Sequence, residues 1–504
     1  MAKPELKTKA TEVSVADFIA AVSKPSPEKE GLKYFASVAF LIVVAVILRV
    51  DAFGDPVANI DDQFYLLVGE RMHQGLLPYA DVWDRKPPGI FVIYYLIAAI
   101  SIEPAFYQIV ATLFAAATAA LVTAIASRWT RRTAATLAGL LYLVMLGNFF
   151  GNSGQTAVFY NLPVAAAAWL LTGPVERRRY EMAMLCLGLA LTIKQTVAFE
   201  AAALGLFAVW RLGPTNRAGN TARFIIVGLI PTSVFSALFL LTGHFAEYWQ
   251  ATFASIFVKS APDAIDILGR SLDLGRRFIP LVALAALSFG LRSCAFAPFR
   301  PFVGLWIAAS IIGMVAVPQL YLHYGLPLVL PLCVGAAAAL DRRITGPLLI
   351  IIAVAGSLIY HRPFQFSAHA NSRAEIAGLV QAVDALPGNT LLVFDGPSAL
   401  YTLTGRRMLS RLAFPSHLNH AGEINVSGLD TNREVSRILA SSPAVVVMTT
   451  QPRNRPENGQ GWKLVRAHVA RNCSIAATKI THEMGSQKLL IYDCTRISGI
   501  PSFR

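Results

Sequence analysis

The sequence predicts a polytopic α-helical membrane protein followed by an α/β domain, and three observations support this fold class. Hydrophobic residues make up 55% of the 504 residues, charged residues only 15%, and the mean hydropathy is +0.52. A soluble protein has roughly 25% charged residues, so a soluble core of this composition would lack polar surface to cover it. Long apolar segments recur up to residue 361, and the composition becomes polar after residue 362.

The predicted membrane spans follow a polar N-terminus. Residues 1–33 are mixed in charge, and no small-residue cleavage site follows the next apolar run, so we expect a cytoplasmic tail before a retained first helix. Residues 34–361 form the predicted transmembrane catalytic domain. Its apolar segments are near the length that spans a bilayer; they are residues 34–50, 104–127, 133–150, 156–172, 181–195, 197–211, 222–242, 277–291, 301–317, 323–340 and 346–360.

The arginines decide how one ambiguous segment, residues 89–102, is placed. If this short segment lies along the membrane surface, five loops that hold thirteen arginines share one side. The short loops on the other side, "GNFFGNSGQTA" and "VPQLYLHY", contain no Lys or Arg. Positive loops face the cytoplasm. The sequence therefore predicts about eleven spans, a cytoplasmic N-terminus, interfacial helices in an external loop at 51–103, and an external C-terminal domain at 362–504.

The net charge of +14 is explained by these arginine-rich loops. No basic stretch interleaves with aromatic residues, so a nucleic-acid partner is not expected.

The C-terminal segment reads as a compact α/β domain. "TLLVFDG", "AVVVMTT", "KLVRAHVA" and "QKLLIYDC" are strand candidates, whereas "NREVSRILAS" and the polar stretch after residue 362 have helical spacing. Cys473 and Cys494 lie on or beside neighbouring strand candidates. Exported domains are oxidised, so a disulfide is one reading and two buried thiols is the other.

Polar residues gather on the predicted external face. The first loop supplies Asp61, Asp62, Asp81, Asp84, Arg85 and Lys86; later turns supply Lys194 in "TIKQT" and Tyr321, His323 and Tyr324 in "PQLYLHYG". A charge at membrane depth costs at least ~2.5 kcal/mol on insertion scales. Lys194 therefore indicates an anionic partner such as a lipid phosphate; the alternative is a lysine that snorkels to the interface.

Asp61 and Asp62 open an amphipathic helix, "DDQFYLLVGERMHQG". Helix capping would explain one of them. Neighbouring helical side chains point about 100° apart, so one aspartate can face a site while the other caps or orients. Pro87 and Pro88 fix the entry to the next helix and hold Lys86 at the surface. A carboxylate that takes a proton from a hydroxyl, beside lysines that neutralise a phosphate, suits a reaction on a lipid-phosphate substrate.

These motifs resemble the polyprenyl-phosphate-sugar-dependent glycosyltransferases of the C-type membrane fold. The family includes bacterial aminoarabinose transferases of lipid A and protein O-mannosyltransferases. The similarity is strongest in "DDQFY" and "ERMHQGLLPYADVWDRKPPG", and extends to "GLALTIKQTVAFE", "YLHYGLPLVLPL" and "LLVFDGPSALYTLTGRRMLSRLAFP". It implies an inverting transfer from a polyprenyl-phosphate sugar at the periplasmic face of a bacterial inner membrane.

The resemblance also implies roles for individual residues. Asp61 matches the catalytic carboxylate, with Asp62 orienting or capping, and Lys86 and Lys194 match the phosphate-contacting basic residues. Substrate contacts are further expected from Tyr65, Asp84, Arg85, Tyr321, His323 and Tyr324. Where the aminoarabinose branch has a glutamate before the "KP" lysine, this chain has Arg85. The sequence thus names no certain cofactor, with a divalent metal the one candidate, and leaves the acceptor open among lipid A, another envelope glycan and protein. A transporter or flippase of lipid-linked sugars is the alternative, but it would need polar residues at the membrane midplane.

Overall fold

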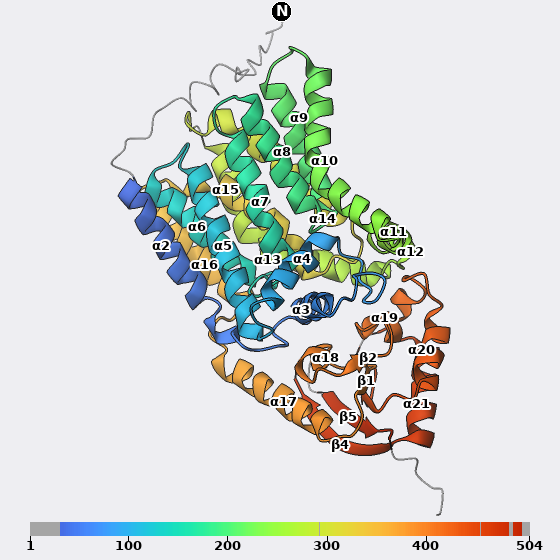
Figure 1. The fold of residues 1–504 in the computed structure, drawn as a ribbon. Helices are drawn as coiled ribbons and strands as arrows, with labels where there is room; N and C mark the ends of the chain where they lie inside the picture. The colour runs from blue at the N-terminus through green and yellow to red at the C-terminus, as the bar shows by residue number, and fades with distance from the viewer. Residues whose placement is uncertain (1–30, 292, 454, 483–486, 496–504) are drawn as a thin grey trace, which may run out of the picture.

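The computed structural model describes residues 31–291, 293–453, 455–482 and 487–495, which form a helical part and a smaller α/β part (Figure 1). Most of the predicted cytoplasmic tail therefore lies outside the described residues. The α/β part packs against one end of the helical part, and the chain enters the helical part at the opposite end (Figure 1).

Each of the eleven apolar segments coincides with a helix, as the sequence predicts. These helices are α2 (Gly31–Ile47), α5 (Pro104–Ala126), α6 (Arg132–Gly147), α7 (Thr156–Leu171), α8 (Arg177–Leu191), α9 (Val197–Arg211), α10 (Arg217–Leu241), α13 (Ala264–Gly290), α14 (Arg300–Val315), α15 (Leu326–Leu340) and α16 (Thr345–Tyr360). Among the described residues, four helical stretches are long and apolar enough to cross a membrane: Pro104–Ala126, Arg217–Leu241, Ala297–Val315 and Leu322–Leu340. The count of eleven spans and their orientation remain predictions.

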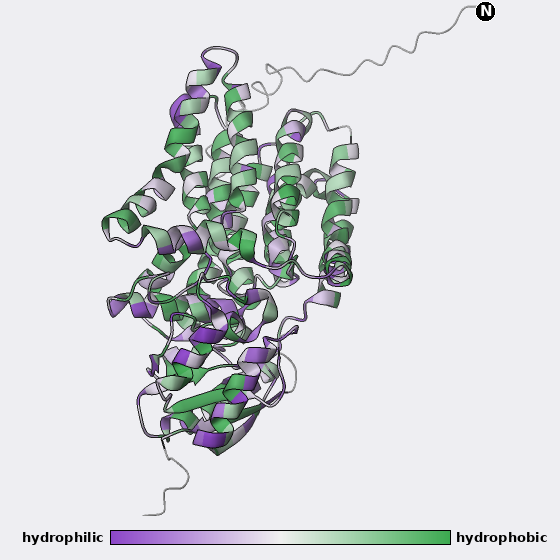
Figure 2. Ribbon diagram, turned by 90° about the vertical axis from the view of Figure 1, so that its right-hand side faces the viewer, coloured by the Kyte–Doolittle hydropathy of each residue, from purple (hydrophilic) through white to green (hydrophobic). Residues whose placement is uncertain are grey.

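Most residues in the helices of the helical part are hydrophobic, whereas hydrophilic and hydrophobic residues are mixed in the α/β part (Figure 2). On helix α10, large apolar side chains, including Ile226, Leu240 and Leu241, are more than half exposed. A soluble monomer rarely exposes a contiguous apolar surface of this kind. This exposure fits a helix that faces lipid.

The loop after α2 contains the two helices that the sequence predicts. Helix α3 (Ile60–His73) begins after Asn59, whose side chain accepts a hydrogen bond from the amide of Asp61 at 3.1 Å. Helix α4 (Pro88–Ala98) has Pro88 in its first turn and Pro87 at its N-cap. Proline is tolerated there because the first helical amides have no partner within the helix. That these helices lie along the interface remains a prediction.

A second loop reaches the same end of the molecule. It contains α11 (Phe245–Trp249), a π-helical turn η3 (Gln250–Ala254) and α12 (Ser255–Val258). Gln250 accepts a hydrogen bond from the Trp83 indole at 3.2 Å and donates one to the carbonyl oxygen of Val426 at 2.7 Å. This loop therefore connects the first external loop to the α/β part.

The α/β part contains a five-stranded sheet in the order β2-β1-β3-β5-β4. Its strands are β1 (Thr390–Val393), β2 (Arg407–Met408), β3 (Val445–Thr449), β4 (Ser474–Thr481) and β5 (Gln487–Asp493). Strand β1 pairs in parallel with β2 and β3, while β5 runs antiparallel to β3 and β4. The helices are α17 (Phe366–Asp384), α18 (Ala399–Leu403), α19 (Ser416–Asn419), α20 (Thr431–Ala440) and α21 (Gly459–Asn472), with a short turn η6 (Ala421–Glu423).

The structure confirms three of the four predicted strands and corrects the fourth. "TLLVFDG", "AVVVMTT" and "QKLLIYDC" contain β1, β3 and β5, but "KLVRAHVA" lies within helix α21. The buried large side chains of this helix, Trp462, Val465 and Val469, are three and four positions apart, which is the spacing of one helical face. Cys473 and Cys494 form a disulfide, which joins the start of β4 to the end of β5.

Candidate active site

The site begins where the first external loop docks on the turn between α8 and α9. The amide of Gly89 donates a hydrogen bond to the carbonyl oxygen of Thr192 at 2.7 Å, and the Gln195 side chain donates one to the carbonyl oxygen of Arg85 at 3.0 Å. A Cβ atom at Gly89 would lie 2.6 Å from that same Thr192 oxygen, so only glycine permits the approach. The docking brings Lys86 and Lys194 to the same end of the helical part.

Asp61 and Asp62 have different partners. Asn59, and neither aspartate, caps α3 through its side chain. The Gln155 side chain donates a hydrogen bond to Asp61 Oδ2 at 2.9 Å, whereas the amide of Gly154 donates one to Asp62 Oδ2 at 2.6 Å. Asp61 is partly exposed, while Asp62 is fully buried and its Oδ1 has no hydrogen-bond partner among the described residues.

The surroundings of the two carboxyl groups separate their pKa values. Burial raises the pKa of Asp62 to about 8; the charge of Asp61 adds to this effect, and the hydrogen bond from the Gly154 amide opposes it. Burial also opposes ionisation of Asp61, but nearby charges on Lys86 and His323, the Gln155 hydrogen bond and the charge on Lys194 lower its pKa below the ordinary value. At neutral pH Asp61 is the ionised partner and Asp62 holds a proton.

Lys86 lies between an acid and an aromatic ring. Its Nζ is 3.8 Å from Asp84 Oδ1 and 5.3 Å from the centroid of the Tyr65 ring. The hydroxyl of Tyr79 donates a hydrogen bond to the Lys86 carbonyl oxygen at 2.8 Å, which fixes the backbone of this residue. The lysine is therefore oriented, yet only one carboxylate lies within ion-pair distance of it among the described residues.

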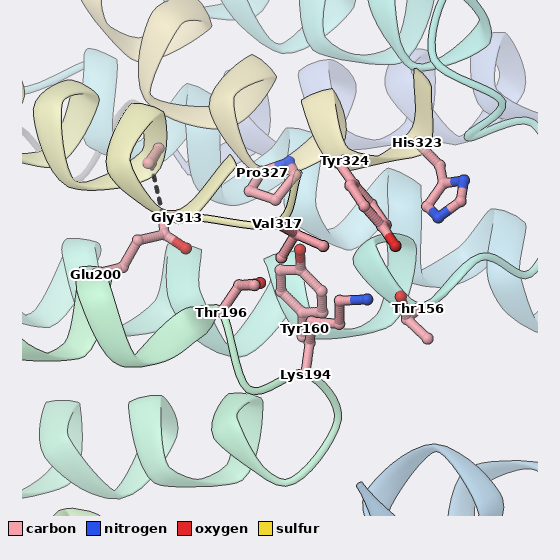
Figure 3. A pocket seen from close by; sticks show the side chains of 11 residues that line it. Thr156, Tyr160, Lys194, Thr196, Glu200, Gly313, Val317, His323, Tyr324 and Pro327 are labelled. Atoms are coloured by element: carbon pink, nitrogen blue, oxygen red, sulfur yellow. Dashed lines mark hydrogen bonds between the residues drawn. The ribbon is translucent and has the colours of Figure 1, made fainter. Parts of the chain in front are cut away.

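The aromatic turn forms another wall of the site. Tyr321 precedes, and His323 and Tyr324 lie in, a short 3-10 turn, η5 (Leu322–Gly325), at the start of α15. Lys194 Nζ lies 4.9 Å from the centroid of the Tyr324 ring, a cation–π distance. Lys194, His323 and Tyr324 line one pocket together with Thr156 and Tyr160, and the side chain of Lys194 projects into it (Figure 3).

The α/β part contributes a carboxylate that the sequence analysis did not include. Glu423 accepts hydrogen bonds from both terminal nitrogens of Arg85, one of them at 3.1 Å. Lys259 Nζ lies 2.8 Å from Glu423 Oε1 and 5.9 Å from the centroid of the Tyr321 ring. Burial opposes ionisation of Glu423, but Arg85 and Lys259 lower its pKa to about 2. Arg85 is thus neutralised by the α/β part.

The structure brings the predicted site residues to one end of the helical part. Asp61 interacts electrostatically with Lys86, Lys194 and His323, and Tyr65 and Asp84 contact Lys86. Tyr321 packs against His323 and Tyr324, while Arg85 points to Glu423.

Sequence reasoning missed three residues that complete this cluster: Gln155, Lys259 and Glu423. Gln155 lies in the basic-free loop "GNFFGNSGQTA", whose polar side chains were the available signal. No recognisable sequence motif surrounds Lys259 or Glu423, so the sequence offered no signal for them.

One cluster of three side chains among the described residues has metal-ligand geometry, and it lies elsewhere. His468, Cys473 and Cys494 have ligand atoms within 4.8 Å of one another. The two cysteines form a disulfide, so their sulfur atoms are not thiolate ligands in this state.

The fold matches that of a protein whose structure has been solved in two states. The crystal structure of ArnT from Cupriavidus metallidurans bound to undecaprenyl phosphate aligns with a TM-score of 0.61 and 12% sequence identity, over 94% of this chain and 100% of that chain. The apo structure of the same protein aligns with a TM-score of 0.61 and 12% identity, over 93% and 99% of the two chains. No protein-family model matches the sequence, and a search of curated proteins finds no match. The likeness confirms the C-type glycosyltransferase fold that the sequence motifs indicate.

Proposed function

We propose that this protein is an inverting glycosyltransferase that moves a sugar from a polyprenyl-phosphate donor to an acceptor of the bacterial cell envelope. The observation that carries the proposal is the docking of the first external loop on the turn between α8 and α9, which brings Asp61, Lys86 and Lys194 close enough to interact electrostatically. The fold is that of a protein crystallised with undecaprenyl phosphate, which supports a lipid-phosphate donor. The acceptor is lipid A, another envelope glycan or protein, and the site would face the periplasm across the inner membrane.

The residues divide the reaction between them. The ionised Asp61 takes the proton of the acceptor hydroxyl as the hydroxyl oxygen attacks the anomeric carbon of the donor sugar. The bond between that carbon and the phosphate oxygen breaks, and polyprenyl phosphate leaves with the electron pair. Lys86 and Lys194 stabilise the charge that develops on this oxygen. A single displacement of this kind inverts the anomeric configuration.

Asp62 has a supporting role in this scheme. Its protonated carboxyl group accepts a hydrogen bond from the Gly154 amide. This hydrogen bond fixes the start of α3 against the loop before α7. Its burial leaves it no access to an acceptor hydroxyl. This arrangement supports Asp61 as the base and Asp62 as a positioning residue.

A transfer assay with the full-length protein tests the proposal. The protein is reconstituted in liposomes with undecaprenyl phosphate that carries a labelled sugar, and an envelope extract supplies acceptors. We expect labelled product, inverted at the anomeric carbon, and release of undecaprenyl phosphate. Asp61→Asn should reduce the rate about 10²–10⁴-fold, the usual contribution of a general base, with donor binding unchanged. Asp384→Asn, an exposed aspartate at the end of α17, is the matched control.

The same assay separates transfer from transport. A transporter of lipid-linked sugars would move the labelled donor across the bilayer without breaking the sugar–phosphate bond. The polar side chains of the site come from loops and helix ends rather than from the middle of the apolar helices, which favours transfer. Movement of intact donor with no labelled product would contradict the proposed function.

A further inference from the structure

A second cavity lies between the first external loop and the α/β part. It has a volume of about 730 Å³, within the range of roughly 300–1,000 Å³ that small-molecule sites have. One wall comes from residues 71–81 and the other from residues 405–437; none of its lining residues belongs to α5–α16. Charged and polar side chains alternate with apolar ones such as Leu76 and Met408 in the lining, a mixture that suits a saccharide, which has polar hydroxyl groups and apolar C–H faces.

The cavity has an excess of positive charge. Its lining includes four arginines, Arg71, Arg407, Arg411 and Arg437, but only two carboxylates, Asp81 and Glu434. The two carboxylates are already occupied. Glu434 pairs with Arg437 at 2.6 Å, and Asp81 Oδ2 accepts the Leu77 amide at 2.8 Å.

Two of the arginines remain available for an anionic ligand. Arg71 is buried and donates to the carbonyl oxygens of Tyr401 and Arg406, so its role is structural. Arg407 and Arg411 form no ion pair with a carboxylate in the part of the chain that the structure describes. Arg407 is exposed on β2, and the guanidinium of Arg411 donates to the carbonyl oxygen of Ser427 at 3.2 Å. A guanidinium group can donate two parallel hydrogen bonds to two oxygens of the same phosphate or carboxylate group.

The wall of the cavity is hydrogen-bonded to the loop that carries Lys86 of the candidate active site. The Trp83 amide donates a hydrogen bond to the carbonyl oxygen of Arg411 at 2.8 Å, and Trp83 lies three residues before Lys86. Arg71, in the cavity wall, follows Asp61 by ten residues on α3, which corresponds to about 15 Å along the helix. A saccharide of several units would be long enough to reach from one end of α3 to the other.

We propose that this cavity is an acceptor subsite that binds an anionic saccharide through Arg407 and Arg411. The inference rests on the proposed function and names the class of acceptor: a glycan that carries phosphate or carboxylate groups several sugar units from the hydroxyl that reacts. It gives the α/β part a role in acceptor recognition that is separate from donor binding.

Binding experiments on the full-length protein in nanodiscs test the subsite without requiring transfer. The probes are glucose 1-phosphate for the phosphate arm, trigalacturonic acid for the carboxylate arm and maltotriose as the neutral saccharide, measured by calorimetry. We expect the protein to bind one of the anionic saccharides more tightly than maltotriose. Arg407→Glu should weaken that binding at least tenfold, since a charge-assisted contact is lost and a repulsive charge added.

The control is Arg433→Glu, which makes the same change at an exposed arginine of α20 outside the cavity and should bind as the unmodified protein does. Arg407→Gln checks the result without introducing a negative charge. Because the backbone amide of Arg407, and not its side chain, bonds to Asn389, both variants should fold. Equal binding of neutral and anionic saccharides, or unchanged binding in both Arg407 variants, would overturn the subsite. Absence of transfer in the unmodified protein would contradict the proposed function but leave this binding result standing.

Discussion

Glu423 and Arg85 form a largely buried ion pair although they lie 338 positions apart in the sequence. The Glu423 carboxylate also pairs with Lys259, and its side chain is only 7% exposed. The carboxylate belongs to the α/β part, whereas its two cations belong to loops of the helical part. The pair therefore ties the α/β part to the loop that carries Lys86.

Loss of this carboxylate should destabilise the protein. Glu423→Gln leaves Arg85 and Lys259 without their counter-ion, and removal of one partner of a buried pair costs about 3–5 kcal/mol. The thermal-unfolding midpoint in detergent should fall clearly. Glu434→Gln is the matched control, because its partner Arg437 is 54% exposed and such pairs contribute about 0–1 kcal/mol. Equal shifts in the two variants would contradict a structural role for the Glu423 pair.

Asp62 should make the stability of the protein depend on pH. The folded protein keeps the Asp62 proton up to about pH 8, while the unfolded chain releases it near the ordinary value of 3.8. The stabilising contribution is complete below pH 3.8 and is lost as the pH rises through 8. Asp62→Asn removes this dependence, and its amide oxygen can still accept the Gly154 hydrogen bond.

Thermal midpoints of the unmodified protein and Asp62→Asn at pH 5, 7 and 9 measure this effect. The variant should become the more stable of the two as the pH increases, and it should keep most of its transfer activity at pH 7. A constant difference between the two proteins across this range would show that the Asp62 carboxyl group has an ordinary pKa.

The two lysines should contribute to donor binding from distant parts of the sequence. Lys86→Ala or Lys194→Ala removes a charge-assisted contact worth about 1.5–3 kcal/mol. The affinity for undecaprenyl phosphate should therefore fall about tenfold to a hundredfold, measured by tryptophan fluorescence in nanodiscs. Lys463→Ala, at an exposed lysine on α21, should have no effect. Unchanged affinity in both site variants would show that these lysines do not bind the donor phosphate and only extend to the membrane interface.

Reporter fusions test the predicted membrane topology. An alkaline phosphatase fused after Arg362 should be active, because this reporter requires export, and one inserted in the segment 174–181, at the start of α8, should be inactive. A green fluorescent protein inserted at the second position should fluoresce. The expectation follows from the arginine-rich loops on one side of the helices. The reverse result at either position would contradict the eleven-span arrangement.

The sequence determined the elements whose signals are local. Apolar length indicated the helices of the helical part, the "DDQFY" segment indicated α3, and the Pro87-Pro88 pair marked the start of α4. The same local reading failed for residues 463–470, because a short apolar run fits a strand as well as a buried helix face. The membrane character could be recognised from the apolar segments that recur along the chain, whereas the C-type fold was implied by the resemblance of particular motifs to a known family.

The tertiary structure decided which residues face one another. Two adjacent aspartates look alike in sequence, but one meets Gln155 and two lysines while the other is buried against the Gly154 amide, and this difference sets their protonation. The pairing of Arg85 with Glu423 likewise joins segments with no local pattern in common. Electrostatic interactions depend on distance and burial in three dimensions, so only the folded chain fixes which carboxylate is charged and which cation is free to bind.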